Sequence, residues 1–184
     1  MEASHAVLIA IQEEGSDGRL VGRTLLQKKL YFACLLLGED FGFQPHYYGP
    51  YSRQVADATD SLVSNRFLDE QVEVFPDRNV FGERRRHSYT LTGDGQQLLT
   101  SGEVGEGVDQ WREAFRRINE RPLATDFNLL SIAAKVNMIL AELGQGTTGD
   151  IRGKANEYGW KMSDDQIDQV AQFLEQLGLA RRSS

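Results

Sequence analysis

The chain has 184 residues, of which 40% are hydrophobic and 26% are charged, and its formal net charge is −7. This composition is typical of a globular protein with an ordinary core, and the length suffices for one large domain or two small ones. The negative charge argues against a protein that binds nucleic acid over its whole surface, so any contact with a polyanion must come from local basic clusters.

The sequence favours a reducing compartment and shows no sign of a membrane anchor. Cys34 is the single cysteine and lies in an apolar run, where it is expected to be a small core residue. No intramolecular disulfide is possible, which fits the cytoplasm. The N-terminus lacks the basic flank and apolar segment of a signal peptide, and the longest apolar run, residues 31–37, is too short to span a bilayer. We therefore expect a cytoplasmic protein with no membrane partner.

The first third of the chain predicts three helices, because apolar residues recur there at helical spacing. They are expected at residues 4–12, 24–37 and 53–65, with Ser4, Thr24 and Ser52 as their N-caps. Between the second and the third helix, the aromatic-rich residues 41–48 should be extended. Gly49-Pro50 should then form a fixed corner that sets the angle of the third helix.

A β-hairpin is predicted to follow these helices. Residues 71–75 alternate between polar and apolar side chains, as a half-buried strand does, and residues 86–91 predict the returning strand. A turn region at 76–79 follows the first strand, and a short helix is expected from Thr92 to Leu99. Three helices followed by a hairpin are typical of a winged helix-turn-helix.

The remainder of the chain predicts a second, helical unit. Residues 103–107 are a Gly/Glu-rich linker, and residues 108–120 form an amphipathic helix that ends before Pro122. A strongly apolar helix at 128–143, a short helix that ends near Tyr158 and a last helix that ends at Leu177 then resemble another helix-turn-helix module. The predicted fold is mainly α with a small β wing: a winged helix-turn-helix domain over residues 1–102, a linker at 103–107 and a helical, HTH-like domain over 108–184.

No motif points to catalysis, to a cofactor or to a metal. The three histidines, His5, His46 and His87, belong to different predicted elements and have no metal-ligand spacing to a carboxylate or to the cysteine. The glycine-rich residues 144–150 do not follow a strand and lack the lysine of a phosphate-binding loop. Asp164-Asp165 is a carboxylate pair in the first turn of a helix, where it favours the helix dipole. We expect no catalytic residue and no enzyme activity.

Local basic residues offer a contact with nucleic acid. The run Arg84-Arg85-Arg86 lies near the predicted wing tip and could neutralise phosphates. The alternative is a solvated hairpin tip that also stops a sheet edge from pairing. Asp57 and Asp60 on the third helix oppose DNA binding. The candidate nucleic-acid-binding residues are Ser52, Arg53, Gln54, Ser61, Arg78, Arg84, Arg85 and Arg86.

Aromatic residues offer a contact with a partner protein. Tyr47, Tyr48 and Tyr51 flank the Gly-Pro corner and could close a core, stack on a base or grip a peptide. Trp111 and Phe115 lie on the apolar face of the amphipathic helix, which must be covered, so this helix is the candidate dimer or interdomain element.

The segment GRTLLQKKLYFA at 22–33, followed by HYYGPYSRQV at 46–55, resembles the YwgA-like proteins, small prokaryotic proteins of largely unassigned function. A related pair of motifs marks the SocA-like or Panacea domain of antitoxins. The resemblance covers residues 19–70 well and the end of the chain more loosely. It implies a winged-helix fold and a role in regulation, defence or toxin neutralisation that depends on binding and not on catalysis.

Two functions follow from these observations. The first is a DNA-binding transcriptional regulator or antitoxin-type protein that acts as a homodimer on double-stranded DNA. The second is a non-catalytic protein–protein interaction module that uses the winged-helix scaffold to bind a toxin or regulator. A continuous positive stripe from Arg53 to the hairpin would favour DNA, whereas an acidic or apolar face there would favour a protein partner.

Overall fold

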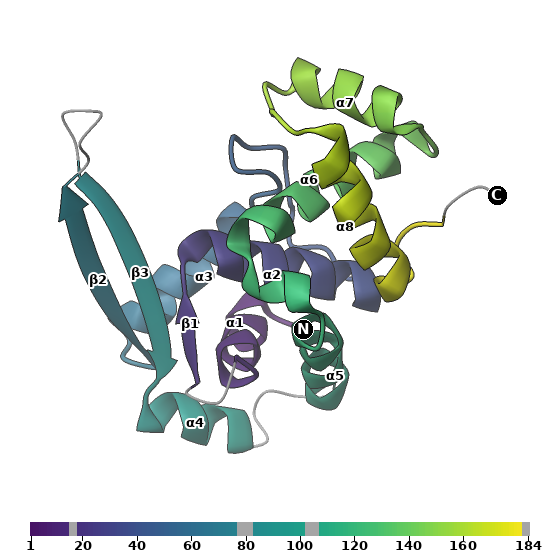
Figure 1. Cartoon of the computed structure of the whole chain (residues 1–184). Coiled ribbons are helices and arrows are strands. Elements are labelled where there is room, and N and C mark those ends of the chain that lie inside the picture. Colours follow the sequence, from purple (N-terminus) through teal and green to yellow (C-terminus); the bar gives the residue numbers. More distant parts are fainter. Residues whose placement is uncertain (15–17, 77–82, 102–106, 182–184) are drawn as a thin grey trace.

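The computed structural model describes residues 1–14, 18–76, 83–101 and 107–181, and within these ranges the protein is mainly helical with one small antiparallel sheet (Figure 1). This agrees with the predicted fold class at that level. The helices are α1 (Ala3–Gln12), α2 (Arg23–Leu37), α3 (Arg53–Ser64), α4 (Gly93–Thr100), α5 (Val108–Asn119), the 3₁₀ helix η1 (Pro122–Thr125), α6 (Phe127–Leu143), α7 (Thr148–Glu157) and α8 (Asp164–Leu177). The strands are β1 (Arg19–Val21), β2 (Leu68–Pro76) and β3 (Glu83–Leu91).

Helix α1 lies at the centre of the protein. All of its residues from Ala6 to Ile11 are completely buried, because α2, α3, α5 and β3 pack around it. A helix that is apolar on every side can only be stable in such a position. The helix starts at Ala3 with no side-chain cap, and the Ser4 hydroxyl, predicted to be the cap, donates to Glu2 instead.

The sheet has the strand order β1-β3-β2, so the predicted hairpin is found and a third strand joins it. Leu20 of β1 and Glu70 of β2 both lie opposite Tyr89 of β3. The hairpin projects from one side of the helical body, on the side opposite α8 (Figure 1). Strand β1 has only three residues, too few for an alternating pattern, and for this reason the sequence did not predict it.

The helices of the second half pack directly on those of the first. Helix α6 packs on α2 and α8, and the rings of Phe32 and Phe173 meet edge to face at 5.3 Å. Buried residues from Ala3 to Leu177 form one hydrophobic cluster. The predicted linker at 103–107 lies, apart from Gly107, outside the described residues.

Several predicted helix ends are confirmed by their side-chain caps. Ser52 accepts a hydrogen bond from the Val55 amide, and Ser163 forms a capping box with Gln166. Helix α2, in contrast, begins after Gly22, whose φ of 108° favours glycine, and Thr24 lies within its first turn. The expected extended stretch at 41–48 contributes one isolated bridge, between Gln44 and Tyr51.

In the described residues, no single helix has the length and apolarity needed to cross a membrane. Helices α6 and α7 meet that criterion only as a pair, which is bent by 99°.

Candidate functional site

Helix α2 and the Gly-Pro corner, the two parts of the sequence motif, hold each other through buried hydrogen bonds. The Gln27 side-chain amide donates to the Ser52 carbonyl at 3.0 Å and accepts from the Ser52 amide at 2.9 Å. The Lys28 ammonium donates to the Pro50 carbonyl. Ser52 was predicted to contact nucleic acid, but it is completely buried: its hydroxyl caps α3 and donates to the Phe41 carbonyl. Its role in this structure is to position α3.

The other predicted nucleic-acid-binding residues lie on two elements. Gln54 and Ser61 are exposed on α3. Arg53 is also exposed there and pairs with Asp57 at 3.4 Å. Arg85 and Arg86 are exposed on β3. Arg78 lies outside the described residues, and Arg84 is described only by its backbone, opposite Phe75.

The charges of this face are mixed. Arg86 forms an ion pair with Glu73 at 2.6 Å, and its guanidinium lies over the Phe75 ring, 4.9 Å from the centroid. Residues 53–91 carry six arginines and seven carboxylates, so their formal charge is −1. The segment that would have to face DNA is therefore not positive.

The predicted partner-binding aromatics divide into buried and exposed residues. Trp111 and Phe115 are 2% and 0% exposed, and Trp111 stacks on Phe41 with ring centroids 5.6 Å apart. The apolar face of α5 is thus covered from within the chain, which leaves these two rings no surface for a partner. Tyr47 and Tyr48 are 72% and 60% exposed, so they do not close the core.

A cluster of polar side chains lies between α2 and the sheet. The Arg23 guanidinium donates to the Tyr89 hydroxyl at 2.8 Å and to the Glu70 carboxylate at 3.1 Å, and it also reaches Asp60 at 3.3 Å. His87 contacts the same Glu70 carboxylate at 2.7 Å. Burial alone would raise the pKa of Glu70, but hydrogen bonds from Tyr89, His87 and Arg23 outweigh it and lower the pKa. These residues are far apart in the sequence, and no motif marks them.

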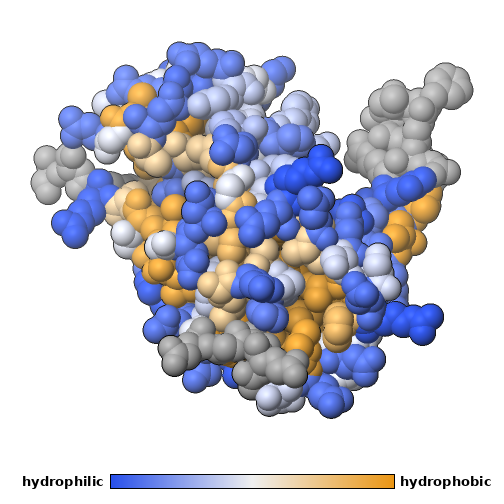
Figure 2. Space-filling view, turned by 180° about the vertical axis from the view of Figure 1, so that it is seen from behind, coloured by the Kyte–Doolittle hydropathy of each residue, from blue (hydrophilic) through white to orange (hydrophobic). Residues whose placement is uncertain are grey.

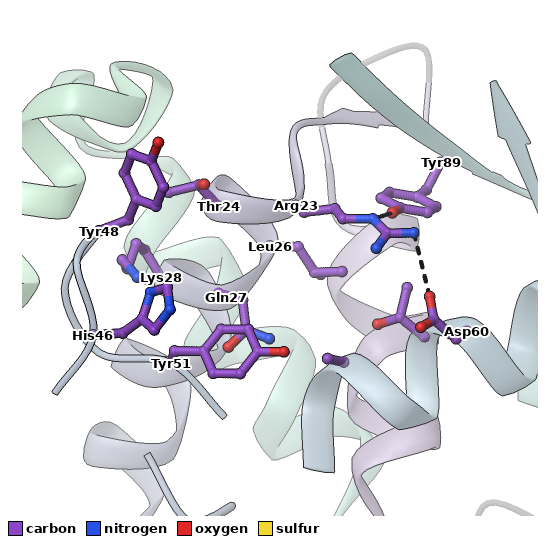
Figure 3. A pocket seen from close by; sticks show the side chains of 12 residues that line it. Arg23, Thr24, Leu26, Gln27, Lys28, His46, Tyr48, Tyr51, Asp60 and Tyr89 are labelled. Carbon is purple, nitrogen blue, oxygen red and sulfur yellow. Dashed lines mark hydrogen bonds and ion pairs between the residues drawn. The ribbon is translucent and has the colours of Figure 1, made fainter. Parts of the chain in front are cut away.

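A pocket of about 160 Å³ opens between α2, α3 and the loop that carries the tyrosines (Figure 3). Lys28, His46, Tyr48 and Tyr51 lie at one end of the pocket, and the Arg23 cluster lies at the other. The lining residues are Arg23, Thr24, Leu26, Gln27, Lys28, His46, Tyr48, Tyr51, Ala56, Thr59, Asp60 and Tyr89.

Lys28 is the most perturbed group in this pocket. It is 2% exposed, and burial, together with the nearby charge of Lys135, lowers its pKa from 10.5 to about 7. Among the described residues, no three His, Cys, Asp or Glu side chains are arranged to hold a metal ion. A buried cation beside aromatic and hydroxyl groups makes this pocket the candidate small-molecule site.

The pKa of Lys28 should be visible in the pH dependence of stability. In the unfolded chain its pKa returns to 10.5, so between pH 7 and 10.5 the unfolded chain binds more protons than the native one, and the stability contributed by Lys28 rises with pH. We expect the stability of Lys28→Met relative to the wild type to fall by about 2 kcal/mol from pH 6 to pH 9, because the cost of the buried charge disappears while the loss of the bond to Pro50 stays the same. Urea unfolding at both pH values measures this change. The exposed Lys161→Met is the control; a stability difference between Lys28→Met and the wild type that is independent of pH would contradict the assignment.

Comparison with known proteins adds no assignment: no family model matches the chain, and neither does any curated protein. The resemblance to the YwgA-like proteins stays a prediction.

Proposed function

We propose that the protein is a non-catalytic protein-binding module built on a winged-helix scaffold, and that a strand of the partner adds to the outer edge of β2. The order α1-β1-α2-α3-β2-β3 and the strand order β1-β3-β2 support the scaffold, because the last two strands then form a wing beside α3. One feature departs from an ordinary helix-turn-helix: residues 38–52 join α2 to α3, in place of a turn of about three or four residues.

The edge of β2 is the observation that carries the proposal. This strand has nine residues, and β3 is its only hydrogen-bonded neighbour in the described part of the sheet (Figure 1). Val72, Val74 and Phe75 are 45%, 51% and 41% exposed. Figure 2 shows hydrophobic atoms on the projecting hairpin beside its grey tip. Long apolar edge strands are usually protected in soluble proteins, and strand addition is a common use of those that are not.

The hydrogen-bond register identifies which backbone groups face outward. The Thr92 amide donates to the Phe67 carbonyl, and the Gly22 amide donates to the His87 carbonyl. Because bonding alternates along antiparallel strands, the odd-numbered residues of β2 bond to β3, which leaves the amides and carbonyls of Glu70, Val72 and Val74 on the outer edge. Val72 and Val74 thus combine outward backbone groups with exposed apolar side chains.

The charge of the same region favours a protein partner over DNA. The formal charge of residues 53–91 is −1, Asp57 and Asp60 lie on α3, and Arg86 is already paired with Glu73. A protein that relies on phosphate contacts needs a net positive surface.

A substitution at Val72 tests strand addition. Proline removes the outward amide but no hydrogen bond to β3, so Val72→Pro should leave the hairpin folded and block pairing. Val72→Thr keeps the amide and is the matched control. We expect the wild type and Val72→Thr to retain the same host protein from a nuclease-treated lysate, and Val72→Pro to lose it by at least about tenfold.

The outcome of that comparison is decisive in both directions. If Val72→Pro retains every protein that the wild type retains, strand addition at β2 is wrong. Circular dichroism of the three chains distinguishes a loss of binding by Val72→Pro from a loss of folding.

A DNA-binding regulator or antitoxin is the second candidate, and the exposed arginines Arg85 and Arg86 on the hairpin favour it. The resemblance to antitoxin-type proteins agrees with either candidate. The test is a pull-down from a lysate that has not been treated with nuclease. If DNA is recovered with the wild type at low salt, and is lost both at high salt and with the Arg85→Ala/Arg86→Ala variant, this second function is supported.

A further inference from the structure

We propose that the pocket between α2, α3 and the tyrosine-bearing loop binds a small aromatic carboxylate, with the ring against Leu26 and Ala56 and the carboxylate at Lys28. This proposal does not depend on the proposed function, because the pocket and the edge of β2 are different surfaces.

The size of the pocket fits one ring. Its volume is about 160 Å³, and an apolar protein cavity of roughly 150 Å³ is known to hold a benzene molecule. Leu26 and Ala56 supply apolar lining, and the tyrosine rings of Tyr48 and Tyr51 border the Lys28 end (Figure 3). A single six-membered ring with one small substituent fills this space, whereas a nucleotide does not fit.

A comparison of two neighbouring lysines indicates the charge of the ligand. Lys28 and Lys29 are equally buried, at 2% and 1% exposure. The Lys29 ammonium pairs with the Glu14 carboxylate. Lys28, in contrast, donates to the Pro50 carbonyl and has no carboxylate partner among the described residues. Because buried charges in proteins are normally paired, Lys28 lacks the anion that Lys29 has.

The surroundings of Lys28 add to this positive charge. Lys135 lies next to it across Gly49: a Cβ atom on Gly49 would come within 3.4 Å of Cε of Lys28 and 3.0 Å of Cγ of Lys135. The Lys135 ammonium lies over the Trp160 ring, 5.5 Å from its centroid. Asp60 is the carboxylate that lines the pocket, but it lies at the far end and is paired with Arg23. The Lys28 end of the pocket therefore attracts an anion.

Hydrogen-bonding capacity is also left over at this end. An ammonium group has three N–H donors, and the Pro50 carbonyl uses one of those of Lys28. Tyr48 and Tyr51 border the same end with their rings, and their hydroxyl groups point away from Lys28 (Figure 3). A carboxylate on the ring would thus meet the remaining N–H donors of Lys28 and would favour its protonated form.

Three probes that share one ring test the proposal: benzoate, the neutral benzamide and the cationic benzylamine. We expect benzoate to cause saturable chemical-shift changes in the amides of Leu26, Ala56 and Thr59 in two-dimensional NMR spectra, with a millimolar or lower Kd. Benzamide should bind at least about tenfold more weakly, since it lacks the charge. Benzylamine should not saturate these shifts.

Two variants separate the contributions of charge and space. Lys28→Met should weaken benzoate by at least about tenfold and leave benzamide nearly unchanged, whereas the exposed Lys161→Met should leave both unchanged. Ala56→Leu should abolish binding of both ligands by filling the pocket, and it keeps the proposal testable if Lys28→Met does not fold. The proposal is wrong if benzoate does not saturate the pocket amides of the wild type, or if it binds Lys28→Met as tightly as the wild type.

Discussion

Gly95→Ala is expected to lower the free energy of unfolding by about 3 kcal/mol. A Cβ atom at this position of α4 would lie 2.2 Å from the Phe67 carbonyl oxygen and 3.1 Å from a methyl carbon of Leu91. The Phe67 backbone has little freedom to move, because its amide donates to Leu62 and its carbonyl accepts from Thr92. Helix propensity alone predicts the opposite sign, with alanine better by about 1 kcal/mol.

Gly93→Ala in the same helix is the matched control. Nothing lies within 4 Å of a Cβ atom at Gly93, so this change should alter stability by less than about 1 kcal/mol. Urea unfolding followed by circular dichroism compares the two variants. Equal stability of the two would mean that α4 does not pack on Phe67 as described.

Gln27→Leu has the second large expected effect, a loss of about 3 kcal/mol. Leucine is one atom shorter than glutamine and leaves the buried Ser52 amide without a partner, while the Ser52 carbonyl keeps only its bond from the Ala56 amide. Each unsatisfied buried polar group costs about 1–3 kcal/mol. Because Ser52 begins α3, the loss should be greatest where α3 meets the Gly-Pro corner.

Hydrogen exchange of the Ser52 amide measures this effect directly, together with urea unfolding. The control is Gln172→Leu on the exposed side of α8, which removes the same group from the surface. If the Ser52 amide stays as protected in Gln27→Leu as in the wild type, the Gln27–Ser52 pair does not stabilise this corner.

Local features of the fold could be predicted from the sequence, because their causes lie within a few residues. Ser52 and Ser163 cap helices through amides three residues ahead, and the alternation in residues 71–75 predicted a strand of the hairpin. Strand β1 forms instead by pairing with Tyr89 and its neighbours, which lie about seventy residues away in sequence. Its own three residues are too few to show the alternation that predicts a strand.

The candidate site was harder to predict, because its properties depend on partners distant in sequence. Lys28 and Lys29 are indistinguishable in the sequence, and only Glu14 makes one of them a paired cation. Trp111 looked available to a partner because Phe41, which covers it, lies seventy residues earlier. The family resemblance rests on Gln27, Lys28 and the Gly-Pro corner. In the structure these two side chains hold the corner in place, so the motif predicts the fold better than it predicts the activity.

The central position of α1 has a consequence for synthesis of the chain. This helix is made before α5, which supplies part of its cover: Arg112 of α5 contacts Gln12, and Asn119 donates to the Glu13 carbonyl. These contacts span 100 and 106 residues, so the apolar helix leaves the ribosome well before its cover does. At roughly 5–20 residues per second, the nascent chain exposes α1 for several seconds, during which it is a natural target for chaperones.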